Sequence, residues 1–336
     1  MAYALLLAAL LLAPVALGAL HRPTRREVYR EMSRNGGDFA ALERETFDRT
    51  GDVEMLFVGD STLWAGIDTP KVEAALKAQH GPDAKALTLA CNWQSGDMAY
   101  VFLRDFFARR RAKTIFFHMP TVLATGEPHP YLHRFWVYGD DPSATVGLPL
   151  RDRAMLYAST VLGAPRHMVG LLRPNRIEPE PAVDTRGTLL EQKGFDGAPF
   201  ELMTKPPPPL SAADGLLSPA TAARYRFANQ PIDDYQIHFF RLAVELAKRN
   251  GARVGFVNIP LRTEAREAVA LERLAWGDVL GTPMPLVGIP GERLFAGLSE
   301  EEVDRLFYNG AHFNVNGSAY FTTAILPALM AVHDAP

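Results

Sequence analysis

Short apolar runs that alternate with helical segments constrain the fold of this chain more than any other feature. The strand-like runs cover residues 53–58, 87–91, 113–118 and 253–259, with a further run near 285–289. Segments with helical periodicity lie between or after these runs, at residues 70–79, 97–111, 233–250 and 264–275. Strands that alternate with helices are typical of a parallel sheet with crossover helices. The sequence therefore predicts an α/β fold.

Residues 121–232 interrupt this alternation. The segment is rich in proline, including the run at 206–209, and has few clean periodic stretches. A long irregular segment within a compact domain is usually a lid, a binding loop or a flexible excursion. We therefore predict a large irregular insertion over the active site. Its aromatic residues would either stack on sugar rings or form a satellite core; they are Tyr131, Phe135, Trp136 and Tyr138.

Residues 1–20 form an apolar segment without a charged side chain, and arginines follow it at positions 22, 25 and 26. About 20 apolar residues are enough to span a bilayer as a helix. The segment is therefore predicted to be a membrane anchor or a cleaved signal segment, and both interpretations stay open. Residues 21–52 then form a connecting segment, and residues 53–336 form the main domain with its insertion.

Composition and charge exclude several classes of function. The chain has 336 residues, 48% of them hydrophobic, which is enough for a large core, and its net charge of −3 gives no reason to expect a nucleic-acid partner. The single cysteine, Cys91, excludes an intrachain disulfide and a cysteine-based zinc site. We predict no cofactor and no catalytic metal, because no phosphate-binding glycine loop occurs and four histidines lack metal-ligand spacing: His129, His133, His167 and His238.

A candidate nucleophile follows the first apolar run, where Gly59-Asp60-Ser61 leads into a predicted helix. A serine hydroxyl needs a base to become nucleophilic. Near the C-terminus, His312 begins the sequence His-Phe-Asn-Val-Asn-Gly, which by itself is also typical of a loop histidine beside a helix cap. Its occurrence well after a Gly-Asp-Ser turn favours Ser61 as nucleophile and His312 as base. Asp60 is expected to be structural, because a carboxylate at such a turn commonly accepts backbone N–H bonds.

Together these two segments resemble the SGNH (GDSL-type) family of hydrolases and acyltransferases. Gly59-Asp60-Ser61 matches the first block of the family, and His312, Asn314 and Gly317 match its last block. The resemblance covers most of residues 55–329 and implies a three-layer, doubly wound parallel sheet of flavodoxin-like type, with Asn314 structural near the site. The architecture is most similar to the membrane-anchored branch that includes the alginate-acetylation and DltD-like proteins.

The chain also departs from the family pattern at two places. Asn309 replaces the acid expected three residues before the histidine, so it can accept a hydrogen bond from the ring but supplies no charge. Three explanations stay open: a slow or dyad enzyme, a substitute acid such as Asp304 or Asp278, or a substitution introduced to trap a complex. The third family block, with its asparagine oxyanion donor, is absent. The predicted oxyanion donors are therefore the N–H groups of Ser61 and Gly96.

These observations predict a membrane-anchored O-acyltransferase or esterase. It would move an acyl group, with acetyl favoured, on a carbohydrate hydroxyl through an acyl-Ser61 intermediate. The resemblance implies a polysaccharide or glycan acceptor, a membrane-bound O-acyltransferase as donor, and a location in the periplasm or at the cell exterior, or secretion if residues 1–20 are cleaved. The arginines after the apolar segment argue against export by the positive-inside rule. The alternative is an SGNH-fold scaffold or glycan-binding protein with weakened catalysis, and a secreted lipase is a third interpretation.

Overall fold

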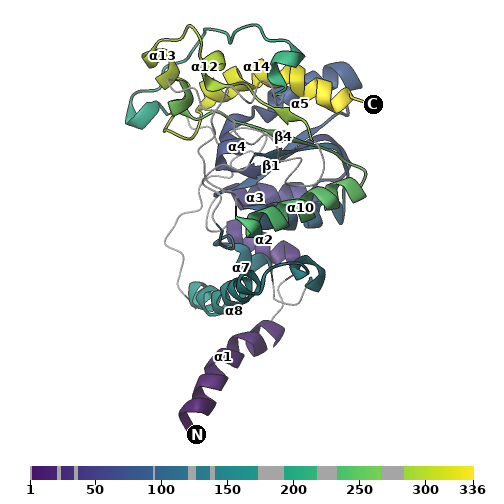
Figure 1. Ribbon diagram of the computed structural model, residues 1–336, viewed down its shortest axis with the longest axis vertical. Helices are drawn as coiled ribbons and strands as arrows, with labels where there is room; N and C mark the ends of the chain where they lie inside the picture. Colours follow the sequence, from purple (N-terminus) through teal and green to yellow (C-terminus); the bar gives the residue numbers. More distant parts are fainter. Residues whose placement is uncertain are drawn as a thin grey trace.

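A computed structural model of the protein describes residues 2–20, 24–33, 37–93, 95–119, 126–136, 141–172, 193–217, 233–265 and 284–336. At its centre lies a five-stranded sheet with strand order β2-β1-β3-β4-β5, in which all paired neighbours are parallel (Figure 1). The strands are β1 (Val53–Asp60), β2 (Ala86–Cys91), β3 (Ala112–His118), β4 (Arg253–Val257) and β5 (Leu286–Val287). The predicted α/β fold with a parallel sheet is confirmed, although β4 and β5 are shorter than expected.

The central strand β1 shows why these segments read as continuous apolar runs. Met55 and Phe57 belong to the core on one face of the sheet, whereas Leu56 and Val58 belong to the core on the other. All four side chains are at most 1% exposed. A strand that is buried on both faces needs apolar residues at every position, so it does not alternate between polar and apolar residues.

Helices cover both faces of the sheet and make three layers (Figure 1). One face packs against α5 (Thr69–His80) and α14 (Val315–Asp334). The other face packs against α6 (Gly96–Phe107) and α10 (Asp234–Arg249), with α2 (Arg25–Ser33) and α3 (Gly37–Glu43) beside them. Five short elements connect these layers; they are η1 (Arg44–Asp48), a π-helix, α4 (Ser61–Gly66), η5 (Arg262–Ala265), α12 (Gly291–Leu294) and α13 (Glu300–Asp304).

The described part of the insertion is more regular than the sequence predicted. It contains α7 (Leu132–Phe135), η2 (Pro142–Thr145), the 23-residue α8 (Leu150–Leu172), η3 (Phe195–Gly197) and η4 (Ala212–Gly215). Phe135 and Trp136 are each 1% exposed and belong to the core on the α6 face of the sheet. For these two residues the structure favours core packing over contact with sugars. Tyr138 and residues 266–275 of the predicted helix at 264–275 lie outside the described residues, and Glu264 and Ala265 belong to η5 instead.

Two helices are long and apolar, and burial distinguishes them. Among the described residues, length and composition alone would allow one helix to cross a membrane, namely α14, but 61% of its apolar window is buried inside the protein. In contrast, α1 (Ala2–Leu20) extends away from the remainder of the protein in Figure 1. Its side chains Tyr3, Leu5 and Leu12 are 88%, 63% and 62% exposed. A 19-residue helix is about 28 Å long, so α1 is compatible with membrane association.

The start of α14 packs closely against residues on both sides of His312, and this contact gives a test of the fold. A Cβ atom at Gly317 would lie 2.1 Å from the Leu306 carbonyl oxygen and 2.3 Å from Phe313 Cδ1. We expect Gly317→Ala to lower the free energy of unfolding by about 3 kcal/mol, at the upper end of typical overpacking costs, because a backbone carbonyl has little freedom to move. Denaturant unfolding of the purified protein measures this change.

Gly310→Ala is the matched control, because a Cβ atom at Gly310 meets nothing within 4 Å. Its free energy of unfolding should change by less than about 0.5 kcal/mol. Equal stability of the two variants would contradict the packing described here.

Candidate active site

The candidate site lies where the strand order of the sheet reverses. The chain passes from β1 to β2 on one side and later returns to place β3 on the other side of β1. In open parallel sheets, such a switch point leaves a crevice at the carboxyl ends of the strands, where ligands bind. Ser61 directly follows β1, and His118 is the last residue of β3. The topology therefore brings both residues to this crevice.

Asp60 caps the helix that begins at Ser61. Its Oδ1 accepts hydrogen bonds from the N–H groups of Thr62 and Leu63, at 3.0 and 3.1 Å, and lies 2.9 Å from His118 Nδ1. Asp60 is 3% exposed and His118 is 1% exposed. The structural role predicted for Asp60 is thus observed, and it includes a histidine partner that the sequence did not indicate.

The buried Asp60 carboxyl is ionised. Burial alone would raise its pKa, but the charge of His118 and the hydrogen bonds from His118 and Leu63 outweigh burial, so the pKa lies below its usual value. A negative charge therefore persists beside Ser61 at neutral pH.

Ser61 and His312 are brought into hydrogen-bonding contact. Ser61 Oγ lies 2.9 Å from His312 Nε2, although the two residues are 251 positions apart in the chain. A tight turn presents the imidazole: Tyr308 N–H donates to the His312 carbonyl at 3.1 Å, and Phe307 and Phe313 form an antiparallel bridge. The Tyr308 ring also stacks on the imidazole at 5.2 Å between ring centroids. The catalytic roles of Ser61 and His312 stay predictions, but their geometry is that of a nucleophile and its base.

Asn309 determines which ring nitrogen of His312 carries the proton. Its Oδ1 accepts from the N–H groups of Ala311 and His312, at 2.9 and 3.0 Å, and lies 2.9 Å from His312 Nδ1. Because two backbone donors require an acceptor, the amide oxygen and not the amide nitrogen faces the ring. Nδ1 must then be the protonated nitrogen, and Nε2 keeps a lone pair for the Ser61 hydroxyl.

The imidazole of His312 is neutral at pH 7. Burial lowers its pKa, the negative charge of Asp60 partly counteracts burial, and His118 lowers the pKa further. Of the two substitute acids considered from the sequence, Asp304 forms an ion pair with Arg262, and Asp278 lies outside the described residues. Asp60 is the carboxylate whose charge favours the protonated form of His312.

Asn314 fixes the loop that carries His312, in agreement with its expected structural role. Its Oδ1 accepts from the N–H groups of Asn316 and Gly317, at 2.9 and 3.2 Å, and so caps α14. Its Nδ2 donates to the carbonyls of Arg305 and Phe307, at 2.9 and 3.1 Å. Asn314 is 0% exposed, so one buried amide joins the turn before His312 to the helix after it.

The structure does not support Gly96 as an oxyanion donor. Its N–H donates to Gln236 Oε1 at 2.7 Å, and a Cβ atom at this position would lie 2.9 Å from the Gln236 carbonyl oxygen. Gly96 therefore allows α6 to pack closely against α10, and its N–H group is already satisfied. The N–H of Ser61, at the first position of α4, stays the predicted donor.

Sequence reasoning missed two other residues near this edge of the sheet. His118 ends the apolar run at 113–118, and only the pairing of β3 with β1 shows that it lies beside Asp60. Trp93 follows β2, whose Cys91 pairs with Asp60. Trp93 is 57% exposed at a φ of 63°, and its ring lies 5.6 Å from that of Tyr131. The positive φ is uncommon for a non-glycine residue and holds an aromatic surface at the same edge as Ser61.

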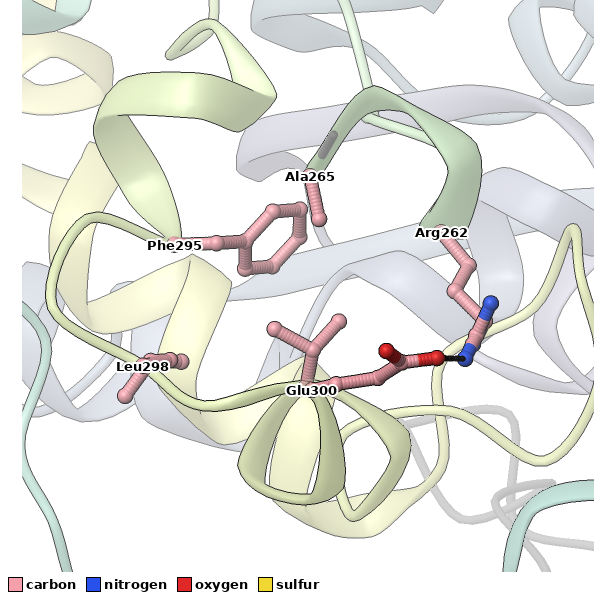
Figure 2. A pocket seen from close by; sticks show the side chains of 6 residues that line it. Arg262, Ala265, Phe295, Leu298 and Glu300 are labelled. Atoms are coloured by element: carbon pink, nitrogen blue, oxygen red, sulfur yellow. Dashed lines mark ion pairs between the residues drawn. The ribbon is translucent and has the colours of Figure 1, made fainter. Parts of the chain in front are cut away.

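A small cavity lies beside η5 and α13 (Figure 2). It measures about 110 Å³ and is lined by Arg262, Ala265, Phe295, Leu298, Glu300 and Val303. Figure 2 shows an ion pair between Arg262 and Glu300, 3.6 Å apart, with the Phe295 ring near Ala265. Arg262 N–H also donates to the Gly310 carbonyl at 3.2 Å, which ties the cavity wall to the turn. Because neither Ser61 nor His312 lines this cavity, we assign it no catalytic role.

No known family model matches this chain, and no curated protein sequence matches it significantly. The resemblance to the SGNH family therefore depends on the motifs and on the site geometry.

The neutral state of His312 leads to a prediction about pH. In its predicted role as base, protonated His312 could not accept the Ser61 proton, so we expect activity to fall as the pH drops through the pKa of His312. We expect kcat/KM for a small ester to fall to half of its maximum, on the acidic side, at a midpoint below about pH 6.5, the ordinary pKa of histidine. Asn309→Asp should move this midpoint upward, because a carboxylate beside Nδ1 stabilises the imidazolium. A midpoint that moves downward in this variant would contradict the assignment of His312 as base.

Proposed function

We propose that this protein is a membrane-anchored acyl-transfer enzyme of SGNH type that forms an acyl-Ser61 intermediate. The observation that carries this proposal is the 2.9 Å contact between Ser61 Oγ and His312 Nε2. The helix cap of Asp60 and the three bonds accepted by Asn309 support it, because they position the serine and select the basic form of the imidazole.

The proposed chemistry proceeds in two half-reactions. Ser61 Oγ attacks the carbonyl carbon of an ester while its proton moves to His312 Nε2. When the tetrahedral intermediate collapses, the ester C–O bond breaks, and His312 returns the proton to the leaving alcohol. A sugar hydroxyl or water then attacks acyl-Ser61 with the same proton transfers, which regenerates Ser61. The Ser61 N–H at the start of α4 is the predicted donor to the developing oxyanion in this scheme.

A carbohydrate hydroxyl is the acceptor we propose, with acetyl as the transferred group. Trp93 supports this choice, because its exposed ring, with the half-buried Tyr131 ring beside it, provides a surface on which a sugar ring can stack at the edge that carries Ser61. The choice of acetyl rests on the resemblance to the anchored SGNH branch.

We further propose that α1 anchors the protein in a membrane, with the domain outside the cytoplasm. The exposed apolar side chains of α1 support an anchor, because such a surface is unfavourable in water. The side of the membrane and a membrane-bound O-acyltransferase as donor follow from the same resemblance. Cleavage of residues 1–20 would instead give a secreted protein.

A glycan-binding scaffold with weakened catalysis is the second candidate function. Two observations favour it: Asn309 brings no charge to His312, and the Gly96 N–H is already bonded to Gln236. This candidate predicts binding of glycans without formation of an acyl-enzyme.

Labelling with a fluorophosphonate probe, followed by peptide mass spectrometry, distinguishes the two candidates. We expect labelling at Ser61 that is abolished in Ser61→Ala and slowed by about 10³-fold or more in His312→Ala, because the hydroxyl depends on its base. Asn309→Asp should raise the labelling rate by about 10-fold or more, since it restores the charge that stabilises the imidazolium. Absence of labelling in the folded wild-type protein would favour the scaffold.

The acceptor surface is tested separately by Trp93→Ala. We expect KM for short oligosaccharide acceptors to rise by about 3- to 10-fold, as loss of one aromatic contact implies. Hydrolysis of p-nitrophenyl acetate should be unchanged, because that substrate does not need the acceptor surface. Tyr157→Ala removes an aromatic residue on α8 that is 42% exposed and serves as the control. Equal KM values for both variants would argue against a sugar surface at Trp93.

A further inference from the structure

A second cluster of chemically active side chains lies at the opposite edge of the sheet from Ser61. His80 is the last residue of α5, and His333 and Asp334 are the last two residues of α14. Glu54 is the second residue of β1, near the amino ends of the strands. Figure 1 shows α5 and α14 side by side near the C-terminus, so the cluster joins the ends of two helices to the beginning of the sheet.

The side chains converge at distances that suit a metal ion. One ligand atom from each of His80, His333 and Asp334 lies within 4.8 Å of the others. His80 Nε2 lies 3.1 Å from Asp334 Oδ1, and His333 Nε2 lies 3.1 Å from Glu54 Oε2. Around a tetrahedral zinc ion with ligands at about 2.0 Å, neighbouring ligand atoms are about 3.3 Å apart. Both observed pairs are close to this separation.

The orientation of His333 is the second observation that points to a ligand. His333 is 0% exposed, and its Nδ1 lies 2.9 Å from Thr114 Oγ1, which fixes the ring. Its Nε2 and Glu54 Oε2 are both buried and face each other at 3.1 Å, but neither atom has the geometry of a hydrogen bond with any described group. An imidazole that is held through one nitrogen and directs the other toward a carboxylate and a second imidazole is the usual arrangement of a metal-binding histidine.

We propose that His80, His333 and Asp334 bind a zinc ion, and that Glu54, which faces His333 but lies outside this group of three, turns its carboxylate to become the fourth ligand. Two imidazoles and two carboxylates are ligands that zinc accepts in tetrahedral sites. Sequence patterns do not indicate this site, because its ligands come from three separate segments of the chain. The inference is independent of the acyl-transfer proposal.

Lys113 is the cation that already contacts this cluster. Its Nζ lies 3.4 Å from Glu54 Oε2, and its side chain is 51% exposed. A zinc ion would displace this ammonium group into solvent, since the lysine stem is long and flexible. The Lys113 charge therefore weakens zinc binding, and its removal should strengthen it.

Zinc at this position would stabilise the fold without taking part in catalysis. The 20-residue α14 spans about 30 Å, with the His312 turn before its first residue and the proposed ligands at its last turn. Arg253 already donates to the carbonyls of Val332, at 3.2 Å, and of His333 at the end of this helix. The metal would add a second link between α14 and the sheet.

The test uses the full-length protein without an affinity tag, in detergent, after removal of metals by a chelator. Zinc binding is measured by isothermal titration calorimetry, and the melting temperature is measured with and without zinc. We expect one zinc ion per chain and a Tm increase of about 3–6 °C at a zinc concentration 100-fold above Kd. His80→Ala and Asp334→Asn should each weaken binding at least 10-fold and remove the Tm increase, whereas Lys113→Met should tighten binding.

His133→Ala controls for adventitious binding by a histidine outside the cluster and should bind zinc as the wild type does. His80 and Asp334 have side chains that are 22% and 32% exposed, so both variants are expected to fold, and their Tm without zinc verifies this. The proposal is overturned if the folded wild type binds no zinc, or if zinc binding is unchanged in both His80→Ala and Asp334→Asn. Fluorophosphonate labelling of Ser61 should be the same in all four variants, which separates this test from that of the proposed function.

Discussion

The geometry of the candidate active site depends on one buried carboxylate. Asp60 closes β1, caps α4 through two backbone N–H groups and holds His118 at the end of the neighbouring strand. A buried charge is tolerated only where such partners surround it, so these contacts fix one another. The direction of Ser61 follows from the cap, and the charge that acts on His312 follows from the same group. Asp60 forms no bond to the substrate in our proposal. It nevertheless positions Ser61, and its charge changes the pKa of His312.

In the proposed site, Asn309 performs only one of two functions that a carboxylate beside a catalytic histidine usually combines. An acid beside a catalytic histidine selects the ring tautomer and stabilises the imidazolium. Here the N–H groups of Ala311 and His312 orient the amide, and the amide in turn orients the ring and places the proton on Nδ1. Tautomer selection is therefore kept, and what is lost is charge. Asp60 offsets this loss only in part, because the pKa of His312 remains below its ordinary value.

The parts that could be predicted from sequence are those encoded locally. Strands buried on both faces appear as apolar runs, and the Gly-Asp-Ser turn and the His-Phe-Asn block are contiguous. The sheet and the contact between Ser61 and His312 could therefore be predicted, whereas the catalytic roles of these two residues stay predictions. The role of Gly96 could not, because its N–H partner Gln236 lies 140 residues away on α10. His118 required knowledge that β3 lies beside β1, and the cluster at His80 and His333 required the pairing of α5 with α14. Each of these depends on strand order or helix packing, which periodicity does not reveal.

The helix α14 runs along the sheet from the end that carries Ser61 to the end that carries Glu54. Its side chains are mostly apolar because they pack against the sheet. It is apolar enough to resemble a membrane span, yet it lies on the sheet with most of its side chains in the core. At its start, Asn314 and Gly317 join it to the turn that carries His312. At its end, His333 contacts Thr114 of β3 and Glu54 of β1. A helix fixed at both ends against the same sheet cannot shift without disturbing the His312 turn. The distance between Ser61 and His312 is therefore set by packing along the whole length of α14, and not only by the residues of the turn.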